Sequence, residues 1–121
     1  MNSKRAIEEL LALVRADPND TRLRLKLGDL YVKTGDVARA LEMYEDVGRY
    51  CAHEGFMLKA IAVYKVMCQI VARDAPHLRA RYAHVPPTLA DLFERLGVHS
   101  MAIEALDALG PNPSSGSHGP S

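Results

Sequence analysis

Apolar residues recur every three to four positions along most of this chain, which is the period of an α-helix. In the first such stretch, Ile7, Leu10, Leu11 and Val14 share one side of a helix while charged residues occupy the other sides. No segment of the sequence shows the sustained alternation of polar and apolar residues that marks a half-buried strand. The pattern therefore predicts an all-α chain.

Prolines and glycines divide the helical pattern into separate elements. We expect helices over residues 3–16, 21–33, 37–53, 56–72, 88–95 and 98–109. Pro18 ends the first helix, because the residue before a proline is pushed away from helical geometry. Gly35, Gly55 and Gly97 suit helix ends, since glycine tolerates the left-handed conformation found there. Residues 77–82 lie between prolines and are expected to form only a short turn or a helix of one to two turns.

The composition indicates what kind of core these helices can build. Hydrophobic residues make up 48% of the chain, but aromatic residues only 6%, and tryptophan is absent. A core of aliphatic side chains and methionine favours packed helices over a sheet. Residues 1–109 are expected to form one helical domain. Residues 110–121 are rich in Gly, Pro and Ser without a large apolar side chain, so they are expected to be a disordered tail.

Charge and hydropathy argue against two classes of partner. Fifteen Lys and Arg balance fifteen Asp and Glu, whereas a nucleic-acid binder usually carries a basic excess, so nucleic acid is not expected as a partner. No segment approaches the ~18 apolar residues of a membrane span, and Glu8 and Glu9 interrupt what a secretion signal would need. A soluble cytoplasmic protein without membrane insertion is the expectation.

The residues that usually carry catalysis or bind metals are not arranged for either. None of the five histidines has a second histidine four residues away, the placement that lets two imidazoles share a metal on a helix. Cys51 and Cys68 both sit inside apolar helical patterns, where cysteine usually behaves as a small buried hydrophobe. We therefore expect no enzyme activity, no metal and no cofactor.

A set of small and aromatic residues recurs along the chain. The first copy is Leu27-Gly28, Tyr31, Gly35, Ala40 and Tyr44. The second copy, twenty residues later, is Val47-Gly48, Cys51, Gly55, Ala60 and Tyr64. A weaker third copy is Leu89-Ala90, Phe93, Gly97, Ala102 and Leu106. Small residues at these positions let two antiparallel helices approach closely while the large ones fill the space beside them, so the spacing predicts packed helical hairpins.

This arrangement resembles the signature of the tetratricopeptide repeat (TPR) family, L-G-x-x-Y followed by G and A-x-x-x-aromatic. The resemblance covers nearly all of residues 3 to 109 and is strongest between Thr21 and Met67, although Arg24 replaces the leading Trp and Ala52 the closing Pro. The amino-acid sequence of residues 50–65 is similar to segments of short bacterial, myxobacterial-like TPR proteins. The resemblance implies antiparallel helix-turn-helix repeats stacked as a short right-handed solenoid, and a non-catalytic protein–protein interaction module.

The resemblance also implies a partner-binding groove on the concave side of the repeats. Carried over onto this sequence, it selects Arg22, Leu25, Asp29, Val32, Lys33, Glu42, Glu45, Arg49 and His53. This mixture of charged and aliphatic side chains suits a peptide or helix of a partner protein lying in a groove. The family's clamp for an acidic chain terminus needs basic and amide side chains, which Leu25 and Asp29 do not supply.

The last predicted helix is apolar on most sides, with a narrow polar strip of Ser100, Glu104 and Asp107. A terminal solenoid helix should turn a polar face to water, so something is expected to cover it. The predicted terminal-helix interface consists of Val98, Met101, Ala105 and Leu109. The alternative is that alanine and methionine are simply exposed, as much of any protein surface is apolar.

The sequence leaves several functions open. An adaptor or scaffold is the leading hypothesis, and a dedicated chaperone or inhibitory subunit that covers one enzyme or secreted protein is its first alternative. A small ligand-binding helical domain, or a small enzyme, would need polar groups that converge near His53, His77 or His84. A homo-oligomer that forms through the first and last helices is a further alternative.

Overall fold

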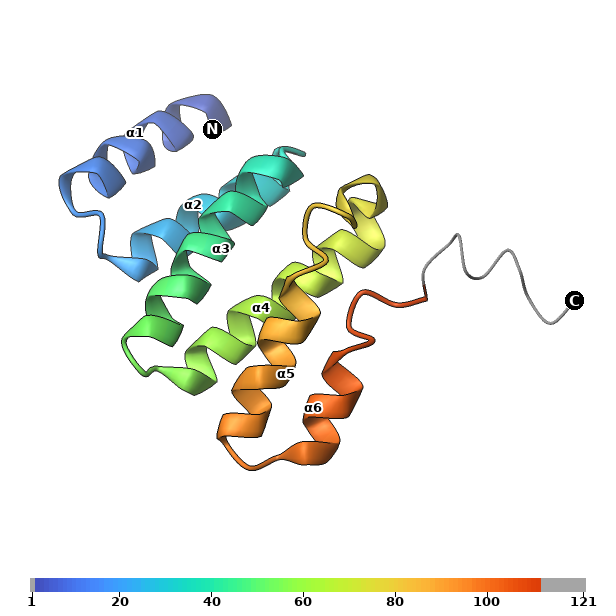
Figure 1. Cartoon of the computed structure of the whole chain (residues 1–121). Helices are drawn as coiled ribbons and strands as arrows, with labels where there is room; N and C mark the ends of the chain where they lie inside the picture. The colour runs from blue at the N-terminus through green and yellow to red at the C-terminus, as the bar shows by residue number, and fades with distance from the viewer. Residues whose placement is uncertain (1, 112–121) are drawn as a thin grey trace, which may run out of the picture. The chain divides into compact units, whose positions relative to one another are not determined.

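The computed structural model describes residues 2–111, and every regular element within them is helical. The elements are α1 (Ser3–Ala16), α2 (Thr21–Lys33), α3 (Val37–His53), α4 (Met57–Asp74), the short 3-10 helix η1 (Pro76–Leu78), α5 (Val85–Arg95) and α6 (His99–Ala105). The predicted all-α fold class of antiparallel helical hairpins is confirmed (Figure 1). In the predicted tail, residues 112–121 lie outside the described residues.

The contacts divide the chain into two compact units, Met1–Val63 and Tyr64–Ser121, with the boundary inside α4. The first unit holds α1, α2, α3 and the beginning of α4. The second unit holds the rest of α4, η1, α5 and α6. A single domain over residues 1–109 stays a prediction.

In the first unit, α2 packs against both α1 and α3, and neighbouring helices run in opposite directions (Figure 1). The limits of these three helices coincide with the predicted ones because polar side chains satisfy their first free amides. Asn2 accepts a hydrogen bond from the amide of Lys4, Asp20 from those of Arg22 and Leu23, and Asp36 from that of Arg39. The core between the helices includes the fully buried side chains of Leu27, Leu41, Val47 and Cys51.

In the α2–α3 hairpin the two helices approach each other at a glycine, as the repeated pattern predicted. Gly28 faces the ring of Tyr44, and a Cβ atom built on Gly28 would lie only 2.9 Å from Cε1 of that ring. Real Cβ atoms essentially never approach so closely, so a side chain at position 28 would displace a ring that is itself 5% exposed. The absence of a side chain at Gly28 therefore sets how near α3 can lie to α2.

Three helices end in the same hydrogen-bonded turn. Gly35, Gly55 and Gly97 have φ of 86°, 85° and 77°, in the left-handed region that favours glycine. After α2, the amide of Asp36 donates to the carbonyl of Tyr31 and the amide of Gly35 to that of Val32. Equivalent pairs of bonds follow α3 and α5. This is the Schellman motif, and its recurrence confirms the predicted role of the three glycines.

The helices of the second unit differ from prediction at their ends. α4 continues to Asp74, because the next residue, Ala75, is buried and donates its amide to the carbonyls of Ile70 and Val71. α5 begins at Val85 rather than at 88. Pro86 and Pro87 fall in its first turn, where a helix amide has no intrahelical partner and a proline therefore costs little.

The last helix is shorter than the predicted range 98–109, because α6 ends at Ala105. Beyond it the amides of Leu106, Asp107 and Ala108 bond to carbonyls three residues back, so the chain tightens into turns. The guanidinium of Arg79, which follows η1, donates to the carbonyls of Leu109 and Gly110 at 2.6 and 2.5 Å. This tertiary contact holds Leu109 and Gly110 in a non-helical path.

Candidate functional site

The structure places the predicted groove residues on accessible parts of α2 and α3 in the first unit. On α2, Arg22, Asp29 and Lys33 are exposed while Leu25 and Val32 are half-buried. On α3 the corresponding residues are exposed, apart from the half-buried Glu45; they are Glu42, Glu45, Arg49 and His53. Each set follows one side of its own helix.

Several of these side chains already have partners inside the first unit. The Tyr44 hydroxyl donates to Oδ1 of Asp29 at 2.6 Å. Arg49 pairs with Asp46 at 3.1 Å, and Nδ1 of His53 lies 3.2 Å from Oε2 of Glu54. Asp29 therefore helps to hold α2 against α3, a contact that the sequence pattern did not indicate.

The environment of Tyr44 raises the pKa of its hydroxyl above the usual value near 10. Burial is the largest cause, and the hydrogen bond to Asp29 and the negative charge of that carboxylate act in the same direction. In the unfolded chain the hydroxyl ionises at its ordinary pKa. The folded protein therefore has an advantage from the protonated hydroxyl below pH 10, and loses it as pH rises beyond that value.

Replacing Tyr44 by phenylalanine should lower the free energy of unfolding by about 1.5–2 kcal/mol at neutral pH, because one hydrogen bond to a charged acceptor is lost. The difference from the unmodified protein should shrink as pH rises past about 10, since only the unmodified protein must then keep a buried hydroxyl protonated. Urea unfolding monitored by circular dichroism between about pH 8 and 11 measures both effects. If the difference in the free energy of unfolding stayed constant over this pH range, a hydrogen bond from the protonated Tyr44 hydroxyl to Asp29 would be contradicted.

Arg24, which stands where the TPR signature has a tryptophan, joins three segments of the first unit. Its guanidinium donates to the carbonyl of Pro18 at 2.7 Å and pairs with Asp46 of α3 at 2.9 Å. It lines a small pocket of about 260 Å³ together with Pro18, Asn19, Thr21, Asp46, Val47 and Tyr50. Because Asp46 and Pro18 already engage the cation, we interpret Arg24 as a structural residue.

A second pocket, of about 330 Å³, opens in the second unit. We call it the α4–α6 pocket; it is lined by Lys65, Cys68 and Gln69 of α4, Leu89 and Phe93 of α5, Met101, Glu104 and Ala105 of α6, and Asp107 and Ala108 beyond α6. Its floor is apolar, since Cys68, Leu89, Phe93 and Ala105 are each less than 10% exposed. The pocket can therefore accept an apolar group.

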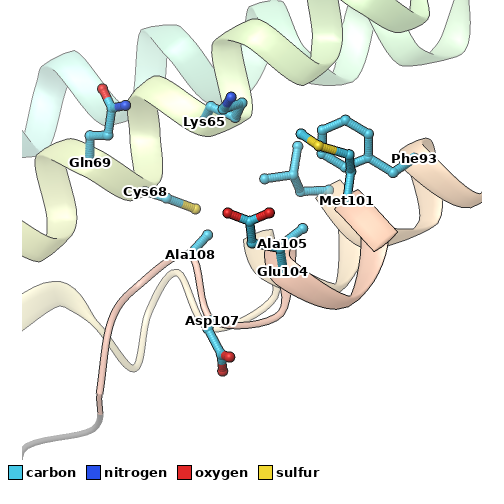
Figure 2. Close-up of a pocket in the computed structure, with 10 residues that line it drawn as sticks. Lys65, Cys68, Gln69, Phe93, Met101, Glu104, Ala105, Asp107 and Ala108 are labelled. Carbon is cyan, nitrogen blue, oxygen red and sulfur yellow. The ribbon is translucent and has the colours of Figure 1, made fainter. Parts of the chain in front are cut away.

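Charged side chains surround this floor. Figure 2 shows the carboxylate of Glu104 between Phe93 and Met101 at one end and Cys68 and Ala108 at the other, with Asp107 directed away at the edge. Lys65 and Gln69 contribute polar groups from α4. In the described part of the chain, no hydrogen bond or ion pair engages the side chains of Lys65, Glu104 or Asp107. These groups are available to a ligand.

The predicted terminal-helix interface only partly overlaps this pocket. Met101 and Ala105 line it, but Ala105 and Leu109 are 5% and 6% exposed and belong to the core, while Val98 is 38% exposed. Ile103 and Leu106, which are not part of the predicted interface, are 70% and 55% exposed. The polar strip of the last helix was the signal that could have located the pocket, because Glu104 and Asp107 of that strip both line it.

Nucleophiles and metal ligands do not form a reactive group in the described residues. Cys51 and Cys68 are buried, as predicted. Burial raises the pKa of both thiols, that of Cys68 to about 11, which keeps them protonated and unreactive at neutral pH. Among residues 2–111, no three His, Cys, Asp or Glu side chains come together to hold a metal ion. His53, His77 and His84 are exposed, and none of them lines either pocket.

The hydropathy and length of the helices were compared with those of a membrane-spanning helix. Within residues 2–111, no helix combines the length and the apolar character needed to cross a bilayer.

Comparisons with known proteins found similarity in structure but none in the searches by sequence. No family model matches the chain, and a search of curated proteins found no match. Among solved structures, the crystal structure of MamA is similar over 90% of this chain and 69% of the MamA chain, at 23% sequence identity and a TM-score of 0.36. At this level the similarity carries no information about function, which has to be inferred from the residues of the chain itself.

Proposed function

We propose that this chain is a non-catalytic interaction module that binds a peptide or helix of a partner protein. The observation that supports this most is the α4–α6 pocket, in which a buried apolar floor is surrounded by charged groups without partners in the described residues. Peptide-binding grooves combine an apolar pocket for an anchoring side chain with polar groups that fix the orientation of the chain. The exposed charged side of α2 and α3 is proposed as a further contact surface.

A reaction centre is a poorer explanation of the same pocket. General acid–base or nucleophilic catalysis needs an activated group placed beside a second group that takes or gives a proton. Cys68 is a nucleophile within the pocket floor, and its raised pKa keeps it in the unreactive thiol form. Lys65 and Glu104 form no ion pair or hydrogen bond in the described residues, so the arrangement provides recognition rather than proton transfer.

Filling the pocket tests the proposal. A random peptide library displayed on phage is selected against the full chain, and bound peptides are then measured against Ala108→Leu. The larger side chain enters the pocket from its half-buried edge, so peptide affinity should fall about tenfold or more. Ala38→Leu, at an exposed position on α3, adds the same bulk elsewhere and should leave affinity unchanged.

A second variant separates the two proposed surfaces. Arg22→Glu combined with Lys33→Glu reverses two exposed charges of α2 and should leave folding intact. A longer natural partner that reaches this surface would bind the double variant more weakly. Failure of the library to yield any peptide whose binding depends on Ala108 would reject the α4–α6 pocket as the interaction site.

A further inference from the structure

We propose that the α4–α6 pocket recognises a peptide segment in which a large apolar side chain lies next to a lysine or arginine. This inference rests on the proposed function, because it specifies the chemistry of the peptide that the pocket would hold. Three features of the pocket carry it: the apolar floor, the central carboxylate of Glu104 and the excess of negative over positive charge among the lining residues.

The floor determines the first half of the motif. Cys68, Leu89 and Phe93 present carbon and sulfur atoms that have no strong hydrogen-bonding group to offer a polar side chain, and Ala105 leaves room above them. A volume of about 330 Å³ stands at the lower end of the range for small-molecule sites, so it suits one or two anchoring side chains. A leucine, methionine or aromatic anchor would bury its apolar surface there.

The charges of the lining residues determine the second half of the peptide motif, which is the lysine or arginine. Glu104 and Asp107 carry two negative charges against the single positive charge of Lys65, so the lining is negative by one charge. The carboxylate of Glu104 lies in the middle of the lining residues, where it would meet a group beside the anchored side chain (Figure 2). A lysine or arginine placed next to the anchor would give Glu104 the charged hydrogen-bond partner that it lacks among the described residues.

Among the residues that line the pocket, Lys65 of α4 carries the single positive charge, and it weakens the attraction for a basic peptide. Removing its charge should therefore strengthen binding. An acidic peptide in the pocket would lie beside the carboxylate of Glu104, with the charge of Asp107 at the edge adding to the repulsion, which disfavours it. Since the charged groups are exposed, attraction of the basic peptide should decrease as salt concentration rises.

The composition of library-selected peptides provides the test. Peptides whose binding is lost in Ala108→Leu should be enriched in Lys or Arg beside a large apolar residue. Glu104→Gln should weaken them about threefold to fivefold, Asp107→Asn less, and Lys65→Gln should strengthen them. Glu8→Gln, at an exposed position on α1, is the matched control and should have no effect. Circular dichroism verifies that each variant is folded.

The outcomes separate this inference from the proposed function. Peptides that depend on Ala108 but show no basic enrichment, or that bind Glu104→Gln unchanged, overturn the motif and leave the interaction module standing. Equal binding of a free aromatic amine overturns the assignment to a peptide. Light scattering that shows a dimer, released by Ala108→Leu, would assign the pocket to a second copy of the chain and also overturn the inference.

Discussion

Replacing Gly28 by leucine should destabilise the first unit by about 3 kcal/mol. Even a single Cβ at this position would lie 2.9 Å from the ring of Tyr44, and leucine adds three further carbon atoms to the same space. The ring cannot easily retreat, because it is buried and its hydroxyl is hydrogen-bonded to Asp29. Urea unfolding followed by circular dichroism measures the loss as a lower transition midpoint.

Removing the ring of Tyr44 tests whether that ring is what a side chain at position 28 would clash with. An alanine in the middle of a helix is favoured over glycine by about 1 kcal/mol. Gly28→Ala therefore combines this favourable effect on the helix with an unfavourable contact between the new Cβ and the ring of Tyr44. In the Tyr44→Ala background the ring is absent, and Gly28→Ala should become neutral or stabilising. If Gly28→Ala had the same effect in both backgrounds, contact with Tyr44 would not be the reason for the glycine.

Replacing Arg79 by alanine should cost about 2–3 kcal/mol, because it removes two charge-assisted hydrogen bonds in a partly buried position. Both bonds end on backbone carbonyls, of Leu109 and Gly110, so their loss should also free the turns after α6. Hydrogen exchange of amides 106–110 should accelerate more than exchange in α5. The α4–α6 pocket should loosen as well, since Asp107 and Ala108 belong to this segment.

Arg95→Ala is the matched control for this prediction. Arg95 is also an arginine of the second unit, but it is exposed, and among the residues that the structure describes it pairs only with Asp91, one turn away on the same helix. An exposed pair of this kind contributes about 0.3–0.5 kcal/mol. Equal losses for the two variants would mean that Arg79 does not hold Leu109 and Gly110 in place.

The sequence predicted α1, α2 and α3 to the residue, because each of their ends carries a local signal. Asp20 and Asp36 cap the amides that begin α2 and α3, and Gly35 and Gly55 permit the left-handed turns that end them. The hairpin contact was also accessible, since the spacing of Gly28 and Tyr44 places a gap on one helix opposite a ring on the next. These features depend on residues that are close in the sequence or belong to the repeat.

The candidate pocket could be foreseen only in part. The polar strip of the last helix indicated that Glu104 and Asp107 share a side, but not that this side meets Lys65 and Cys68 of α4. Likewise, helical periodicity continued to residue 109, whereas the helix ends at Ala105. No pattern within the last helix could show that Arg79, thirty residues earlier, binds the carbonyl of Leu109.

What the sequence alone determined is therefore the helical class, the limits of the capped helices and the close approach of α2 and α3. These follow from backbone preferences and from side-chain volume, which act over a few residues or within a hairpin. Tertiary structure alone decided where the chain stops being helical and where an apolar floor meets unpaired charges. Both depend on side chains that are distant in the sequence, and whose positions are fixed only when α4, α5 and α6 pack together.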